Sequence, residues 1–187
     1  DVVAVRFVHV DDVVASDASC DAVVDFANCT VGIGDLWPSA TQEEMLLSER
    51  AEALPAMMLA EVMRDDEAVV VRGARRFSAT AGFTDTFRFV RAVDTPASAP
   101  PPPDVVVMDA AVFGGEPLAA QLSERMVLRE LLKAHTALAT AAATGAAGAP
   151  YVVRTGHWGG GSFGGVRFVK ALLQAMAAAA AAAATAR

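Results

Sequence analysis

Short apolar runs alternate along this chain with longer segments whose apolar residues recur at helical spacing. The runs at residues 22–26 and 105–108 carry few polar side chains, which is typical of strands covered on both faces of a sheet. Alternating strands and helices predict an α/β fold in which helices are layered on a central sheet. We expect strands over residues 2–10, 22–26, 68–71, 105–108 and 151–154, an extended segment over 83–90, and helices that begin at Thr41, at Pro55 (through Met63), at Ser123 and at about Arg167.

The length of 187 residues suits one domain with a sizeable core, so we expect a single domain over residues 1–187. Residues 95–103 hold five prolines and predict a surface loop. The formal net charge is −7, whereas a protein that binds nucleic acid by neutralising phosphates is usually basic. We therefore expect no direct DNA binding.

Composition also bears on the compartment. The alanine-rich stretch at 171–184 is too short and too weakly apolar for a membrane span of roughly 20 residues, so we expect no membrane partner. The first residues lack the basic region of a signal peptide. The two cysteines, Cys20 and Cys29, have a spacing that fits no zinc or redox motif, which is typical of a protein from a reducing compartment.

Residues 25–44 combine a strand end, a glycine turn and a helix start that carries two carboxylates, Glu43 and Glu44. One interpretation is structural, because Thr41 with Glu44 three residues later forms a capping-box pattern. The other is chemical: glycines let a backbone approach a phosphate, and a neighbouring carboxylic acid can protonate a leaving oxygen. Adjacent helical residues do not share a face, so the two glutamates cannot be the opposed pair of an ordinary glycosidase. The capping and catalytic roles can also be divided between them.

A second glycine loop at residues 159–164 matches G-x-G-x-x-G between a predicted strand and a predicted helix, which is the context of dinucleotide binding. That fold also needs an acidic residue about 20 positions later, but residues 166–187 contain no Asp or Glu. The loop is then either a phosphate-facing loop at a helix N-terminus or a structural turn. His157 in this loop is a candidate ligand contact, and the scattered histidines indicate no metal cluster.

Several motifs occur together in one order. Residues 25–28 (D-F-A-N), 32–34 (G-I-G) and 42–44 (Q-E-E) are followed by residues 73–78 and 81–89, by 105–110 (V-V-V-M-D-A), by 129–134 (R-E-L-L-K-A) and by 155–165 (T-G-H-W-G-G-G-S-F-G-G). In sequence and spacing, this series resembles the catalytic macrodomain of the poly(ADP-ribose) glycohydrolase family. The likeness covers nearly the whole chain.

The resemblance implies a macrodomain-like mixed β-sheet sandwiched between helices. It also implies hydrolysis of ribose–ribose O-glycosidic bonds in poly(ADP-ribose), which releases ADP-ribose. By position, Glu44 corresponds to the general acid/base, Glu43 and Asn28 to residues that hold the ribose, and Asp25 to a supporting residue. The resemblance places further substrate-binding residues around the ligand: Gly32, Ile33, Gly34, Gly159, Gly160 and Gly161 at the diphosphate, Gln42 on the adenosine side, and Phe83, His157 and Phe163 beside them.

The resemblance implies no metal and no cofactor. The expected partners are poly(ADP-ribose), ADP-ribose and ADP-ribosylated proteins, and the expected setting is the DNA damage response in the nucleus or cytoplasm. It also implies that the family's helical N-terminal portion and the strands after its last helix are missing from residues 1–187.

The chain departs from the family pattern at several positions, and Ala15 and Ser16 stand where relatives have acidic residues. Ile33 replaces the middle glycine of the triplet, Phe83 a tyrosine, His157 an asparagine and Val166 an aspartate. A β-branched residue at position 33 is strained if the turn requires a positive φ there. An alternative function is therefore an inactive module that binds ADP-ribose, or a structural subunit of a larger assembly. An Ile33 side chain that occupies the diphosphate position would favour the structural role.

Overall fold

The computed structural model describes residues 4–6, 17, 19–36, 40–96, 98–143, 145 and 149–185. The strand expected at 2–10 lies largely outside these residues. A four-stranded sheet has the order β2-β5-β1-β6. Its strands are β1 (Ala22–Ala27), β2 (Val69–Val71), β5 (Asp104–Asp109) and β6 (Val153–Arg154). Strand β1 runs parallel to β5 and β6, whereas β2 is antiparallel to β5, so the sheet is mixed.

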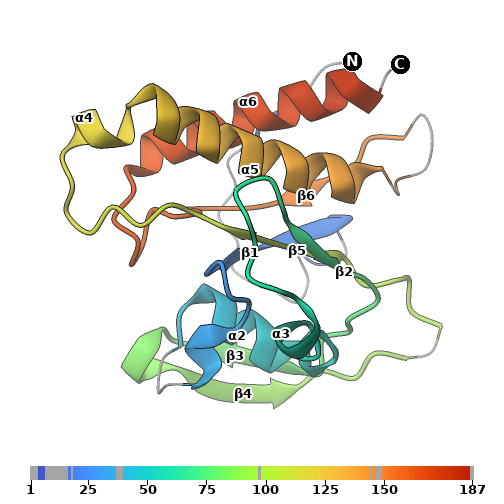
Figure 1. Ribbon diagram of the computed structural model, residues 1–187. Coiled ribbons are helices and arrows are strands. Elements are labelled where there is room, and N and C mark those ends of the chain that lie inside the picture. Colours follow the sequence, from blue (N-terminus) through green and yellow to red (C-terminus); the bar gives the residue numbers. More distant parts are fainter. Residues whose placement is uncertain are drawn as a thin grey trace.

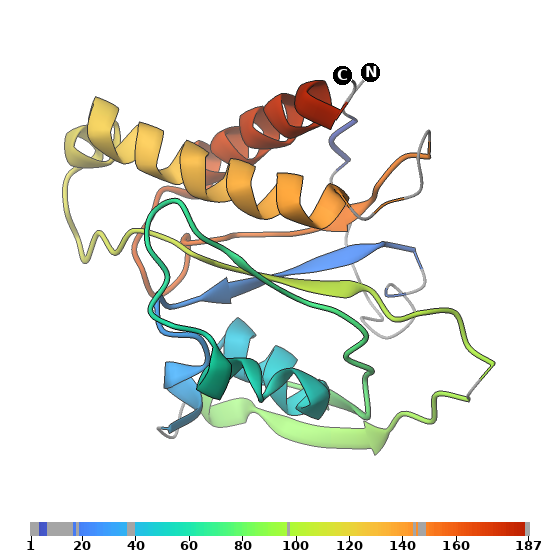
Figure 2. The same cartoon turned by 45° about the vertical axis from the view of Figure 1, so that its right-hand side comes forward.

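Helices cover both faces of this sheet (Figures 1 and 2). The long helices α5 (Glu124–Ala142) and α6 (Arg167–Thr185) lie on one face, preceded by the short α4 (Leu118–Gln121). On the other face lie α2 (Gln42–Glu49) and α3 (Ala56–Leu59), with the hairpin of β3 (Ser78–Ala81) and β4 (Arg88–Ala92) beyond them. The predicted α/β fold with a mixed sheet between helices is confirmed.

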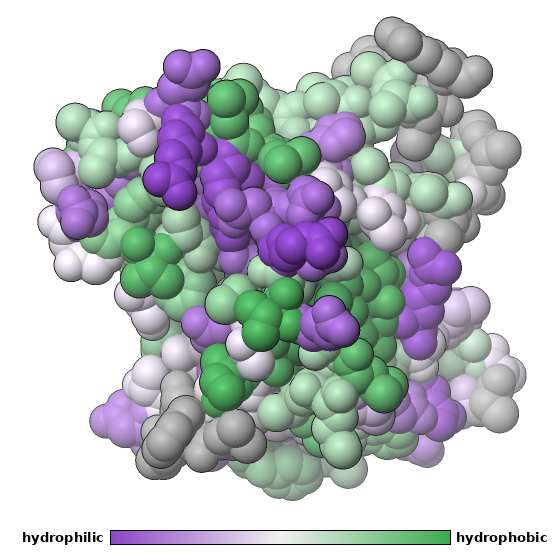
Figure 3. All heavy atoms as spheres, viewed as in Figure 1, coloured by the Kyte–Doolittle hydropathy of each residue, from purple (hydrophilic) through white to green (hydrophobic). Residues whose placement is uncertain are grey.

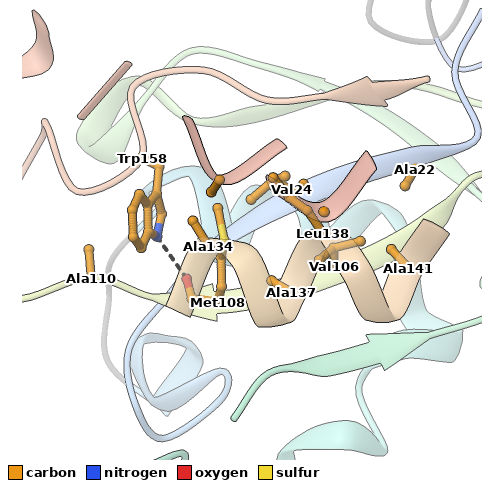
Figure 4. Packing of buried hydrophobic residues seen from close by; sticks show 12 residues of the cluster. Ala22, Val24, Val106, Met108, Ala110, Ala134, Ala137, Leu138, Ala141 and Trp158 are labelled. Carbon is orange, nitrogen blue, oxygen red and sulfur yellow. Dashed lines mark hydrogen bonds between the residues drawn. The ribbon is translucent and has the colours of Figure 1, made fainter. Parts of the chain in front are cut away.

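The alternation of side chains along β1 and β5 divides the core into two layers. Val24 and Val106 belong to a cluster with alanines of α5 and α6, and Trp158 closes one end of it (Figure 4). The indole nitrogen of Trp158 donates to the Met108 carbonyl over 3.1 Å. The neighbouring residues of the same strands, such as Val23, pack instead against α2. The two central strands are thus apolar on both faces, as their sequences predict.

The predicted starts of three helices are confirmed. Thr41 and Ser123 are the N-caps of α2 and α5, and α6 begins at Arg167. The helix predicted from Pro55 through Met63 is wrong in its length, because α3 ends at Leu59 and Ala60 is extended. A long-range contact outweighs helix continuation here: the backbone N–H of Met63 donates to the Cys29 carbonyl over 2.8 Å, and its side chain is buried.

The extended segment predicted over 83–90 is also partly wrong. A 3₁₀ turn, η3 (Thr84–Thr86), comes first, and the strand begins only at Arg88. The Thr86 hydroxyl accepts from the Phe83 backbone N–H over 2.9 Å, so a local side-chain contact competes with the strand. The backbone N–H of Thr84 donates to the Ala40 carbonyl over 2.8 Å, which ties this turn to the start of α2.

Helix α6 is the one helix within the described ranges that is long and apolar enough to cross a membrane by length and composition, with a mean hydropathy of 1.3 over Arg167–Ala184. Its Ala177 and Ala181 pack in the same buried cluster as Ala137 and Ala141 of α5. On the face seen in Figure 3, hydrophilic side chains gather around α5 and the loop before β2, above a mainly apolar area around α3. The absence of a membrane partner stays a prediction.

Candidate functional site

A cavity of about 320 Å³ lies beyond the carboxyl end of β1, where open α/β sheets commonly bind their ligands. It brings together the 3₁₀ turn η1 (Ile33–Leu36), the start of α2 and the loop between β6 and α6. The residues around it are Phe26, Asn28, Ile33, Gly34, Thr41, Glu43, Glu44, Ser162 and Phe163. A hollow of about 380 Å³ between α5 and α6 is lined by apolar side chains and His135, and holds none of the predicted site residues.

Glu43 supports the first glycine turn from within the protein. Its side chain is only 1% exposed, and its Oε1 accepts from the backbone N–H of Gly32 over 2.7 Å. Gly32 has φ +66°, and a Cβ there would lie 2.4 Å from Cγ of Met57. Glycine is therefore required at position 32 by both conformation and space.

Glu44 forms the predicted capping box and also borders the cavity. Its Oε2 accepts from the Thr41 backbone N–H over 2.6 Å and from the Thr41 hydroxyl. A Cβ at Gly34 would lie 1.7 Å from Glu44 Oε1, so this carboxylate position depends on a glycine at 34. The side chain of Glu44 is 6% exposed. The structural and chemical interpretations of Glu44 are thus compatible, because one oxygen caps the helix while the other lies against the glycine turn.

Ile33 takes the place of a glycine without backbone strain. Thr84 is the one non-glycine residue with positive φ among those described, so Ile33 does not need the left-handed conformation. The backbone N–H of Ile33 donates to the Thr30 carbonyl over 3.3 Å. Ile33 belongs to the wall of the cavity, where it replaces hydrogen with an apolar side chain.

Gln42 is attached to the sheet. Its Oε1 accepts from the backbone N–H of Phe26 over 2.7 Å, and its Nε2 donates to the Val24 carbonyl over 3.0 Å. Strand β6 pairs only with Ala22 and Val23, so the Gln42 amide continues the ladder where β6 ends. Gln42 is not among the residues that line the cavity, and its predicted place beside adenosine stays a prediction.

Asp25 and Asn28 flank the end of β1. Asp25 is fully buried, and by strand alternation its side chain lies on the same face as Val23 and Ala27, toward α2. Asp25 is not among the residues that line the cavity, and its supporting role stays a prediction. Asn28 is half-buried and lines the cavity.

The second glycine loop is held by its own backbone and by α6. The backbone N–H groups of Gly160 and Gly165 donate to His157 and Gly159 over 2.8 and 2.9 Å. Gly159 has φ +65°, and a Cβ there would lie 2.6 Å from Cβ of Ala110. Gly159, Gly160 and Gly161 are not among the lining residues, whereas Ser162 and Phe163 of the same loop are.

Phe83 and His157 lie outside the cavity wall. Phe83 is 53% exposed, and its turn is joined to the residue before Thr41 by the Thr84–Ala40 hydrogen bond. His157 is exposed. Neither residue is among those lining the cavity, so their contacts with a ligand stay predictions.

Sequence reasoning missed two kinds of residue. Phe26 and Ser162 line the cavity although no motif distinguished their roles. The buried pair of Lys170 and Glu130 lies behind the second glycine loop. The sequence signal for this pair was a lysine within the alanine-rich segment that forms α6. No group of three His, Cys, Asp or Glu suited to a metal ion was found among the residues the structure describes.

Comparisons with known proteins bear on the family of this chain. Residues 4–185 match the model of the poly(ADP-ribose) glycohydrolase family, macro domain fold. The chain is 31% identical over 169 residues to poly(ADP-ribose) glycohydrolase 2 of Caenorhabditis elegans, which covers 82% of this chain and 34% of that protein. It is 27% identical over 181 residues to poly(ADP-ribose) glycohydrolase 1 of the same organism, covering 90% and 23%.

A shorter match of 66 residues is 39% identical to poly(ADP-ribose) glycohydrolase 1 of Arabidopsis thaliana, covering 35% of this chain and 12% of that protein. The chain thus spans about a third or less of the length of each of these relatives. The family model, in contrast, matches almost all of the chain, including the glycine turn, Glu43, Glu44 and the second glycine loop. The chain belongs to the poly(ADP-ribose) glycohydrolase family with the macrodomain fold.

Proposed function

We propose that this protein is a glycosidase that hydrolyses ribose–ribose O-glycosidic bonds in poly(ADP-ribose), with Glu44 as the general acid/base. The observation that carries the proposal is that the two oxygens of the Glu44 carboxylate have different surroundings. Oε2 is held by Thr41, whereas Oε1 has no hydrogen-bond partner among the described residues and lies against Gly34 in the cavity wall. One oxygen is held by Thr41, and the other is free of a protein partner among the described residues, which supports a role in proton exchange with a ligand.

The mechanism follows from this single carboxyl group. Protonated Glu44 donates a proton to the leaving ribose oxygen, and the bond from that oxygen to the anomeric carbon breaks as an oxocarbenium-like centre forms. Glu44, now a carboxylate, takes a proton from water as the water oxygen bonds to that carbon, which restores the acid. Glu43 keeps the glycine turn in place through Gly32, and Asn28 lines the space for the sugar.

The test is to incubate the protein with automodified polymerase and to measure released ADP-ribose. Glu44→Gln keeps the size of the side chain and removes the acid, so release should fall by about 10²- to 10⁴-fold. Glu61→Gln, at an exposed site outside the cavity, is the matched control and should leave release unchanged. Equal release by wild type and Glu44→Gln would reject the proposal.

A second candidate function is favoured by Ile33. Ile33 is among the residues that line the cavity, so a β-branched residue borders the space that a glycine triplet would leave open. This favours a module that binds ADP-ribose without cleaving the polymer, or a structural role in a larger assembly. Calorimetry with ADP-ribose separates these options: binding without turnover supports the module, and no binding supports the structural role.

The remaining expectations are part of the same proposal. Poly(ADP-ribose) and ADP-ribose are the ligands, and ADP-ribosylated proteins are the carriers of the polymer. The low number of cysteines and the net charge of −7 support a reducing compartment, nucleus or cytoplasm, and the absence of direct DNA binding. A role in the DNA damage response follows only if the protein cleaves or binds the polymer.

A further inference from the structure

The chain has three glutamines, Gln42, Gln121 and Gln174, and the side-chain amide of each is hydrogen-bonded inside the protein. A glutamine amide offers an acceptor oxygen and two donor hydrogens at its end. It can therefore bind a backbone N–H and a backbone carbonyl at the same time. A side chain of this kind can fix a loop segment that has no neighbouring strand.

Gln121, the last residue of α4, binds the second glycine loop in this way. Its Oε1 accepts from the Val166 backbone N–H over 2.9 Å, and its Nε2 donates to the Gly164 carbonyl over 3.3 Å. The residue is only 6% exposed, so little water competes for the amide. Two residues later, Ser123 is the N-cap of α5, which packs into the core through Ala134. Gln121 thus ties the loop to a core helix.

Gln42 holds the backbone beside another cavity residue with the same pattern, because its amide bridges the Val24 carbonyl and the Phe26 N–H. In both bridges the carbonyl belongs to a residue two positions before the N–H. This is the pair of groups that one residue of a parallel neighbouring strand engages. Phe26 lines the cavity, and so does Phe163, the residue directly before the Gln121 bridge.

The backbone at Phe163 is fixed at two successive carbonyls. The Phe163 carbonyl accepts from the Phe113 backbone N–H over 2.8 Å, and the next carbonyl, that of Gly164, accepts from Gln121. The Phe163 side chain packs against the buried cluster that contains Trp158. The loop cannot move Phe163 without breaking these bonds, so this part of the cavity wall is formed before a ligand arrives. A preformed wall lowers the entropy cost of binding.

Gln174 of α6 provides a comparison within the same loop. It is also 6% exposed, and its Oε1 accepts from the Thr155 hydroxyl over 2.6 Å while its Nε2 donates to the Gly156 carbonyl over 3.2 Å. Thr155 and Gly156 are not among the residues that line the cavity. Gln174 therefore matches Gln121 in burial and in chemistry, but its bonds lie away from the cavity wall.

We propose that Gln121 is a positioning residue for the cavity: through Gly164 and Val166 it fixes Phe163, so that a ligand meets this wall already in place. Gln121 does not touch the ligand and takes no part in proton transfer. The inference rests on the proposed function, because ADP-ribose is the ligand with which it is measured.

The test is calorimetry of ADP-ribose binding together with the kinetics of release from the polymer. Gln121→Met keeps the length of the side chain and removes both bonds. If Phe163 is then in place about a tenth of the time, the apparent Kd should rise about tenfold. KM should rise with it, whereas kcat should stay within about twofold because Glu44 is untouched. Gln174→Met, the matched control, should bind ADP-ribose as the wild type does.

A double-mutant cycle separates positioning from a general loss of stability. Phe163→Ala removes the side chain that Gln121 is proposed to position. Gln121→Met should therefore weaken binding no further when it is added to Phe163→Ala. A residue that only stabilises the fold would have no such coupling to Phe163 in the affinity.

The outcomes separate this inference from the proposed function. No binding of ADP-ribose by the wild type would contradict both. If the wild type binds, an unchanged Kd in a folded Gln121→Met protein would overturn the inference alone, and so would a further tenfold loss in the Phe163→Ala background. Circular dichroism shows whether each variant is folded. If Gln121→Met does not fold, the same criteria apply to Gln121→Glu, which keeps the acceptor for Val166 and loses the amide donor to Gly164.

Discussion

The two glycine segments on either side of the cavity are supported by groups of opposite charge. Behind the first turn, Glu43 accepts from Gly32, and Glu44 lies against Gly34. Behind the second loop, the ammonium group of Lys170 lies against Gly159. Carboxylates therefore support the first turn, and a cation lies behind the second loop.

The comparison shows that a glycine in a loop can be required by the side chain packed behind it. At Gly34 and Gly159 the missing Cβ makes room for a charged side chain of the protein itself. A glycine motif thus indicates what packs behind a loop as well as what approaches it from the front. The two loops should then respond differently to the same substitution.

The largest expected effect concerns the second glycine loop, behind which Lys170 lies. Glu130→Gln leaves the buried Lys170 without its carboxylate partner, and breaking a buried pair in this way costs about 3–5 kcal/mol of unfolding free energy. Adding Lys170→Met should recover part of the loss, because it removes the cation that has lost its partner. Urea unfolding of the single and double variants measures both values, and a double variant no more stable than Glu130→Gln would contradict the account.

The pH dependence of Glu130→Gln has a definite sign. Burial lowers the pKa of Lys170 to about 7 in the folded wild type, and losing Glu130 should lower it further. The unfolded state then binds more protons than the folded state from about pH 7 to 10, so stability of the variant should rise with pH in this range. Urea unfolding at several pH values, compared with Lys170→Met, isolates this contribution.

A smaller effect on stability is expected at the first glycine turn, where Glu44 lies against Gly34. In Gly34→Ala, the new Cβ would displace the end of Glu44 and no backbone atom, so the free energy of unfolding should fall only by the capping contribution of Glu44, about 1 kcal/mol. Misplacing the carboxylate should lower ADP-ribose release by about 100-fold, or about 2.7 kcal/mol in the barrier. Unfolding and release are measured on the same sample, and unchanged release would separate Glu44 from the reaction.

The same substitution in the second loop should act on stability. In Gly159→Ala, the Cβ would meet Ala110 at 2.6 Å, and the residue has φ +65°. Overpacking and left-handed strain together should cost about 1–3 kcal/mol of unfolding free energy. A Gly159→Ala protein as stable as wild type would show that the two loops are not supported differently.

The smallest effect concerns Ile33. Its backbone needs no glycine, so Ile33→Gly should cost up to about 1 kcal/mol, mainly through unfolded-chain entropy. The variant enlarges the cavity beside Glu44, and tighter ADP-ribose binding in calorimetry would indicate that Ile33 restricts the site. Weaker binding would show instead that the Ile33 side chain contributes a contact.

Much of the fold was predictable because it depends on local signals. The apolar strands at 22–26 and 105–108 and the N-caps Thr41 and Ser123 involve residues close together in the sequence. The helix after Pro55 was too long in the prediction because its end is decided by Met63 reaching Cys29, a contact far away in sequence. The turn before Arg88 was missed because Thr84 is bound to Ala40.

The sequence by itself determined the layered α/β architecture, the family, and the pairing of a glycine turn with two carboxylates at a helix start. Only the tertiary structure decided that Gln42 completes the sheet, that Ile33 enters the cavity wall without strain, and that Lys170 and Glu130 support the second loop. The physical reason is the range of the interactions. Caps and strand patterns act over a few residues, whereas charge pairing and close packing join segments whose sequence separation carries no pattern.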